Sequence, residues 1–208
     1  MFGITNYSAF VIAFILLLLL PGPGNLALIT STSKGGIKGG LAATLGVIAG
    51  DQVLMWMAIA GVAALLGTYP TAFQAVQWLG AAYLVWLGVK LLLAKAGDQP
   101  ILNIRPSHFF HQAMMITLLN PKAIVFYMAF FPLFIDPTIV KQANQAWLTY
   151  GAMSATIVTL TFLYGLIAVL LTHFMAERIR SNPRITSVLQ KLAGVFLIGF
   201  GVKLVLSK

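Results

Sequence analysis

The feature that most constrains this chain is the run Pro21-Gly22-Pro23-Gly24-Asn25, which interrupts an apolar segment extending from about Tyr7 to Thr30. Proline removes a backbone N–H and clashes with the preceding turn, and glycine adds conformational freedom, so an α-helix must break here. In lipid, a broken backbone is tolerated only where protein or a water-filled cavity satisfies the freed polar groups. If the segment spans a membrane, the break therefore predicts a cavity.

The composition places the chain in a membrane. It is 60% hydrophobic and 8% charged, whereas a soluble domain carries about 25% charged residues. The apolar runs are continuous rather than alternating, which predicts helices and not a β-barrel. The +9 net charge is spread between the apolar segments, so it predicts membrane orientation and lipid contact rather than a nucleic-acid partner. The absence of cysteine excludes cysteine nucleophiles and thiolate metal sites, and we expect no catalytic centre, metal or cofactor.

Apolar runs of about 20 residues predict an all-α membrane protein with six transmembrane helices, forming a single domain over residues 1–208. The predicted spans are Tyr7–Ser31, Leu41–Leu66, Phe73–Leu93, Phe109–Phe134, Ala146–Thr172 and Val188–Leu206. Lys and Arg gather in the first, third and fifth connecting loops, while the second loop has none and the fourth only Lys141. By the positive-inside rule, the odd-numbered loops face the cytoplasm and both termini lie on the opposite side of the membrane.

An internal repeat supports this count. The segment Tyr83–Lys95 aligns without gaps on Phe196–Lys208, with Gly-Val-Lys-Leu shared at Gly88–Leu91 and Gly201–Leu204. The third and sixth spans thus match, and the first and fourth both carry helix-breaking prolines. Two units of three helices enter the membrane from opposite sides, so residues 7–95 and 109–208 predict a 3+3 inverted repeat with the first and fourth helices broken. Chance similarity between two apolar helices is the alternative.

Asp51 is the only acidic residue deep in a predicted span. It lies about 10 residues from the inner end, or roughly 15 Å at 1.5 Å per residue, near the middle of a hydrocarbon core about 30 Å thick. A charge there costs at least about 2.5–3.5 kcal/mol on insertion scales, so such residues usually face a cavity or a partner. We expect Asp51 to carry a substrate amine or a coupling proton; a purely structural ion pair is the alternative.

The predicted partner of Asp51 is Lys122, the deepest basic residue, which follows Asn120 and Pro121. Asparagine caps helices and proline fits the first helical position, so the fourth helix is expected to restart at mid-membrane. Restarted half-helices point positive N-terminal ends at the centre. The two breaks would then hold a carboxylate, while Asp51 takes an ammonium group or a proton. Packing kinks at the prolines are the alternative.

Two weaker patterns concern the second and fifth spans. Ala42, Gly46 and Gly50 form a small-residue stripe, whose ordinary meaning is close helix packing. The fifth span is rich in hydroxyl groups, which either line a path or bond to their own helix backbone. Its hydroxyl residues are Ser154, Thr156, Thr159 and Thr161.

The chain resembles the LysE/RhtB family of bacterial amino-acid exporters. The motifs that carry the resemblance are Pro21-Gly22-Pro23, Gly50-Asp51, Asn120-Pro121-Lys122 and the run from Gly80 to Gly88, and it covers essentially the whole chain. The resemblance implies proton-driven efflux of amino acids or close derivatives across the inner membrane. A dibasic substrate would favour a second acidic site, which no predicted span offers, so we expect a neutral, zwitterionic amino acid.

Other functions fit the residues less well. An intramembrane aspartyl protease needs two mid-membrane carboxylates and this chain has one, so we expect a transporter and not an enzyme. A gradient-independent facilitator or channel stays the alternative, although a pore would be expected to carry a continuous polar stripe and the polar groups here gather at one level. The sequence leaves a homodimer open.

Overall fold

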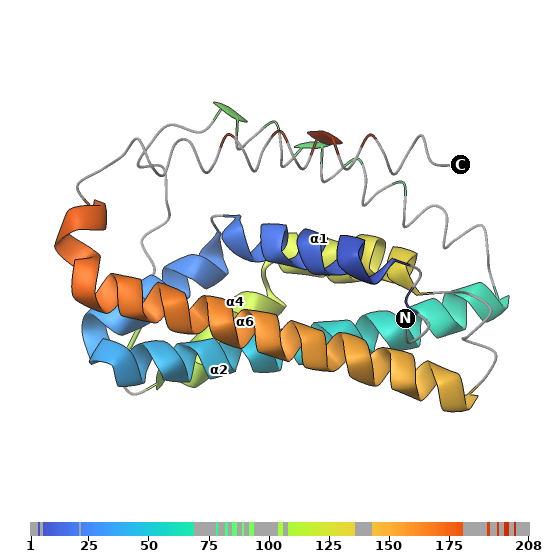
Figure 1. Cartoon of the computed structure of the whole chain (residues 1–208), viewed down its shortest axis with the longest axis horizontal. Helices are drawn as coiled ribbons and strands as arrows, with labels where there is room; N and C mark the ends of the chain where they lie inside the picture. The colour runs from blue at the N-terminus through green and yellow to red at the C-terminus, as the bar shows by residue number, and fades with distance from the viewer. Residues whose placement is uncertain are drawn as a thin grey trace.

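The protein was analysed as a computed structural model (Figure 1). It describes residues 4, 6–20, 22–68, 104–105, 108–135 and 143–180, together with the isolated positions 78, 82, 85–86, 89, 92–93, 191, 195, 198–199 and 202. Pro21, most of the third and sixth predicted spans, and most of the repeated segments 83–95 and 196–208 lie outside the described residues. Every element in the described part is helical, apart from an isolated bridge between Ile4 and Ile135.

The first helix ends inside the apolar segment, and a second one starts after three intervening residues. Helix α1 covers Tyr7–Leu19, and its C-terminal cap Leu20 has extended backbone angles (φ −62°, ψ 121°). Helix α2 covers Pro23–Thr68, and its first turn is closed by a hydrogen bond from the Leu26 amide to the Gly22 carbonyl at 3.1 Å. The helix is therefore interrupted between Leu19 and Pro23, which leaves backbone groups of the last turn of α1 to be satisfied from elsewhere.

A single residue turns α2 back on itself. Gly36 has φ 60° and ψ −157°, a combination that residues with a Cβ avoid and glycine adopts freely. The part of α2 before Gly36 continues away from α1, and the longer part after it runs back in the opposite direction (Figure 1). The sequence predicted a connecting loop between the spans Tyr7–Ser31 and Leu41–Leu66, but a single glycine makes the reversal and helix continues on both sides of it.

Another helix start follows at Asn120. Helix α4 covers Phe109–Leu118 and the short helix α5 covers Pro121–Val125. The chain then continues as the π-helix η2, Phe126–Phe130, and the 3-10 helix η3, Phe131–Phe134.

Helix α6 covers Ala143–Arg180 and is longer than the predicted fifth span. The portion Ala146–Phe174 has a mean hydropathy of 2.1, and Pro23–Gly61 of α2 has 1.5; by length and composition these two segments are able to cross a membrane. A helix of 20 residues already spans about 30 Å, so each is long enough to extend beyond the hydrocarbon core.

The long part of α2 packs between α4 and α6, in a register set by small residues. Gly50 lies against Thr117 of α4, and a Cβ at Gly50 would meet the Thr117 Cβ at 2.8 Å. A Cβ at Gly46 would meet the Phe110 carbonyl oxygen at 2.2 Å, so the expected small-residue packing is confirmed at these two glycines. On the other face, Gly165 of α6 leaves room for Thr44. Helix α4 therefore runs parallel to this part of α2, while α6 runs antiparallel to it.

Two buried apolar clusters lie along these helices. The larger holds interlocked rings from α1, η2 and η3, in which Phe10 contacts Phe131 and Phe134, and Phe14 contacts Phe126. The smaller cluster lies toward the Gly36 turn and includes Leu28, Val47 and Ala113. Members of both clusters line one polar cavity, which therefore lies where the two clusters meet.

Candidate functional site

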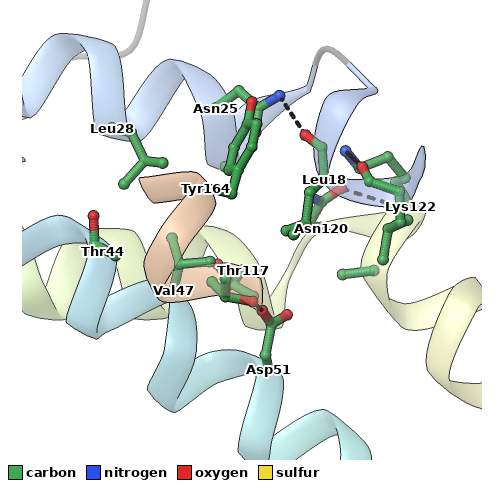
Figure 2. Close-up of a pocket in the computed structure, with 14 residues that line it drawn as sticks. Leu18, Asn25, Leu28, Thr44, Val47, Asp51, Thr117, Asn120, Lys122 and Tyr164 are labelled. Carbon is green, nitrogen blue, oxygen red and sulfur yellow. Dashed lines mark hydrogen bonds between the residues drawn. The ribbon is translucent and has the colours of Figure 1, made fainter. Parts of the chain in front are cut away.

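A small cavity lies where α1 ends and where α2 and α5 begin (Figure 2). It has a volume of about 40 Å³, enough for about three water molecules but not for an amino acid. Its lining combines polar groups with aliphatic side chains from α1, α2, α4, α5 and α6. The lining residues are Leu17, Leu18, Gly24, Asn25, Leu28, Thr44, Val47, Asp51, Thr117, Asn120, Lys122, Ala123, Thr161 and Tyr164.

Five of the nine residues expected to bind substrate line this cavity: Gly24, Asn25, Asp51, Asn120 and Lys122. The other four follow a different pattern. Gly22 lies beside Lys122, since a Cβ built on it would be 3.3 Å from the Lys122 Nζ. Pro23 and Pro121 are the first residues of α2 and α5 and are not among the lining residues. The expectation for Pro21 falls on a position outside the described residues.

Asp51 contributes a nearly fully buried carboxylate, with 5% of its surface exposed. Thr161 of α6 donates a hydrogen bond to Asp51 Oδ2 at 3.3 Å. The phenol of the buried Tyr127, on η2, is a further polar neighbour of this carboxylate. Among the described residues, Thr161 supplies the one hydrogen bond of this carboxylate. A carboxylate buried this far is costly to keep charged without a partner, so the site is suited to receiving a cationic group or a proton.

Lys122 is the cationic group of the site, but it does not pair with Asp51. Its Nζ donates to the backbone carbonyls of Leu17 at 3.0 Å and Leu20 at 2.8 Å. The two side chains therefore form no direct salt bridge, contrary to the expected ion pair, although their opposite charges attract each other across the cavity. Free carbonyls at the C-terminal end of a helix carry partial negative charge, which explains why an ammonium binds there.

Asn25 satisfies the same end of α1. Its side-chain amide donates to the Leu18 carbonyl at 3.1 Å and to the Leu20 carbonyl at 2.9 Å. Figure 2 shows Asn25 and Lys122 on the side of the cavity near Leu18, with Asp51 on the opposite side. Asn25 thus holds the broken backbone together at the edge of the cavity, a role that its place two residues after Pro23 does not reveal.

Asn120 serves the second helix start. Its side-chain oxygen accepts a hydrogen bond from the Lys122 amide at 3.1 Å, which caps α5, and Pro121 occupies the first turn, where a missing N–H costs nothing. The cap sets the position at which the Lys122 side chain leaves the backbone and reaches α1.

Sequence reasoning missed several lining residues and left Thr161 among the alternatives. The hydroxyl-rich fifth span uses its groups differently: Thr161 bonds to Asp51, Ser154 bonds to Gln52 at 2.5 Å, and Thr156 bonds to its own helix at Ala152. Thr117 was not predicted, although it lies just before the second helix start. Its buried hydroxyl makes no hydrogen bond within the described part of the chain, so it is open to a ligand in the cavity.

Comparison with known proteins identifies the family of this chain. Residues 15–208 match the family described as LysE type translocator. The chain is a member of the LysE type translocator family. This translocator is therefore a membrane transporter and not an enzyme. It is 34% identical over 207 residues to the leucine efflux protein of Salmonella choleraesuis (strain SC-B67), covering 98% of this chain and 96% of that protein. It is 32% identical, with the same coverage, to the leucine efflux proteins of Klebsiella pneumoniae subsp. pneumoniae and Enterobacter sp. (strain 638). No solved structure matches the translocator significantly.

Proposed function

We propose that this protein exports neutral, zwitterionic amino acids of the leucine type across the bacterial inner membrane in exchange for protons. The observation that carries the proposal is the cavity in which the carboxylate of Asp51 and the ammonium of Lys122 lie on opposite sides of an otherwise uncharged lining. An α-amino acid also carries one group of each sign. The names of the relatives, which are leucine efflux proteins, support the same substrate class.

The remainder of the lining suits an aliphatic substrate. Leu17, Leu18, Leu28 and Val47 contribute apolar surface. The hydroxyl of Thr117, which has no partner among the residues that the structure describes, offers a hydrogen bond for orientation. Binding sites for small molecules combine these features: a mostly apolar wall and a few placed polar groups. Because the cavity is too small for leucine as described, binding requires the lining helices to separate, which is the behaviour expected of an alternating-access carrier.

Within this proposal, the two helix interruptions face each other at the bilayer midplane. Residues 7–95 and 109–208 form the two inverted repeats of one six-helix domain, and the N-terminal ends of α2 and α5 present N–H groups to the substrate carboxylate. Near the Gly36 turn, the ammonium of Lys34 donates a hydrogen bond to the Ile104 carbonyl at 2.8 Å. The Lys and Arg residues near this turn make it the basic end of the molecule. This end faces the cytoplasm, both termini are periplasmic, and lipid surrounds the outer faces. The proposal is compatible with a homodimer.

Asp51 carries the coupling proton in this scheme. Because it is costly for a buried carboxylate to stay charged and unpaired, Asp51 takes up a proton from one side of the membrane and gives it up to the other in alternation with substrate binding, which links the two fluxes. Replacement of Asp51 by asparagine keeps the size of the side chain and removes the proton site. We expect the D51N variant to lose transport driven by a pH gradient.

The test is the flux of labelled leucine in proteoliposomes, with and without an imposed pH gradient. The proposal predicts gradient-dependent flux by the wild type, background flux by D51N, and normal flux by E177Q, because Glu177 lies in α6 beyond the apolar portion Ala146–Phe174. Flux that ignores the gradient would identify a facilitator instead. Failure to carry any amino acid would reject the function, and full gradient-driven flux by D51N would remove Asp51 from coupling.

A further inference from the structure

The C-terminal end of α1 has more acceptors than its own backbone can satisfy. The Leu16 carbonyl receives the Leu20 amide at 3.1 Å, but the carbonyls of Leu17, Leu18 and Leu20 receive side-chain donors from Lys122 and Asn25. The prolines that follow supply no N–H. These carbonyls carry the partial negative charge of the helix C-terminus. They adjoin the cavity, because Leu17 and Leu18 line it.

The group bound there is a primary ammonium. Lys122 Nζ offers three donors and uses two of them for the Leu17 and Leu20 carbonyls. The α-ammonium of an amino acid has the same charge and the same three donors. Gly22 leaves space for such a group, because a Cβ at that position would be 3.3 Å from Nζ and 3.5 Å from the preceding carbon of Lys122. The end of α1 is therefore shaped to hold a –CH2–NH3⁺ or –CH–NH3⁺ group.

We infer that the Leu17 and Leu20 carbonyls bind the α-ammonium of the substrate, and that Lys122 occupies this position as a tethered competitor while the cavity is empty. Arrival of a substrate exchanges one ammonium for another at the same acceptors, so no buried carbonyl is left unpaired during the exchange. Lys122 is then released toward the cavity, where the carboxylate of the same substrate neutralises it. Asn25 keeps its bonds to Leu18 and Leu20 and holds the helix end in place.

This inference rests on the proposed function, since it takes the substrate to be an amino acid, and it makes that function more specific. In this arrangement the substrate amine binds the carbonyls at the end of α1, and Asp51, on the opposite side of the cavity, binds the coupling proton. It also explains why Lys122 points away from Asp51: its present partners are the backbone carbonyls, and its release depends on a ligand with an amino group.

Two fragments of leucine test the exchange in the purified protein in detergent. 3-Methylbutylamine is leucine without its carboxylate, and 4-methylpentanoate is leucine without its amino group. Lys122→Met removes the competitor, so we expect it to bind 3-methylbutylamine about tenfold more tightly than the wild type does, which corresponds to about 1.4 kcal/mol. Its affinity for 4-methylpentanoate should stay the same or fall. Binding is measured by calorimetry and checked by the ligand-induced rise in melting temperature.

Lys34→Met is the matched control, because Lys34 also donates to a backbone carbonyl, that of Ile104, but does not line the cavity. It should leave both affinities unchanged. If K122M does not fold, K122Q replaces it, since glutamine keeps a donor near the carbonyls without the charge; as a neutral amide it competes more weakly than an ammonium, so a smaller gain in amine affinity is required. Unchanged or weaker amine binding in the folded variant overturns the inference, while leucine flux by the wild type in proteoliposomes tests the proposed function separately.

Discussion

The two interruptions of the helices satisfy their freed backbone groups in different ways. At the end of α4 the chain closes on itself: the Leu119 amide bonds to the Met115 carbonyl at 3.0 Å and the Asn120 amide to the Thr117 carbonyl at 3.1 Å. At the end of α1, the carbonyls depend on side chains, one of which comes from α5. The second interruption therefore uses backbone amides of the same segment, whereas the first relies on side-chain donors.

The residues after each helix explain this difference. A helix end is normally closed by the amides of the next few residues. Leu119 and Asn120 both have an N–H, and the proline after them occupies a first-turn position where none is needed. After α1, Pro21 and Pro23 remove two of the three amides that follow Leu20. The first interruption therefore has spare acceptors, and Lys122 at the second interruption supplies the cation that meets them.

The largest effect should come from removing that cation. Lys122→Met leaves the Leu17 carbonyl without a side-chain donor and weakens the set around Leu20, and each unsatisfied buried acceptor costs about 1–3 kcal/mol. We expect a clear fall in the melting temperature of the purified protein in detergent. Lys34→Met removes an exposed ammonium from the Ile104 carbonyl and should cost no more than about 0.5 kcal/mol. Equal losses in the two variants would show that the first interruption does not depend on its cation.

Of the two asparagines, Asn25 at the first interruption should contribute more to stability than Asn120 at the second, and both effects should be smaller than that of Lys122. Asn25→Ala removes two hydrogen bonds to carbonyls of the α1 end, and we expect a cost of about 1–3 kcal/mol. Asn120→Ala removes a single capping bond, for which about 1 kcal/mol is typical. The melting temperatures of both variants, measured in the same detergent, show which substitution costs more stability. The reverse order would mean that the second interruption is the more dependent of the two on its asparagine.

Where the described helices begin and end depends on local chemistry, and the sequence is informative there. The starts at Tyr7 and Phe109 agree with the predicted spans. The turn at Gly36 was not predicted, because four glycines occur between Lys34 and Leu41 and the sequence does not show which one takes a positive φ. Helix α6 continues to Arg180, beyond the apolar stretch, since a helix extends past the lipid wherever no breaker stops it.

The site could be predicted as a set of residues but not as a set of contacts. Asp51, Asn25 and Lys122 stand out because charges and amides are rare within apolar segments. Whether Lys122 reaches a carboxylate or a carbonyl depends on how α5 is placed against α1, over a hundred residues earlier in the chain. Likewise, Thr161 contacts Asp51 because of how α6 is rotated about its own axis. That rotation cannot be read from a single sequence.

The smallest effects should separate the two glycines of the first interruption. A Cβ at Gly22 would lie 3.3 Å from the Lys122 Nζ, whereas a Cβ at Gly24 would have no atom within 4 Å. The end of a lysine side chain yields easily, so we expect Gly22→Ala to lower stability by less than about 1 kcal/mol, by weakening the ammonium–carbonyl bonds. Gly24→Ala lies in the first turn of α2 and should be neutral or gain up to about 1 kcal/mol from helix propensity. Melting temperatures and leucine efflux of both variants make the comparison. If Gly24→Ala were as harmful as Gly22→Ala, flexibility of the Pro-Gly-Pro region rather than space around the ammonium would be what these glycines provide.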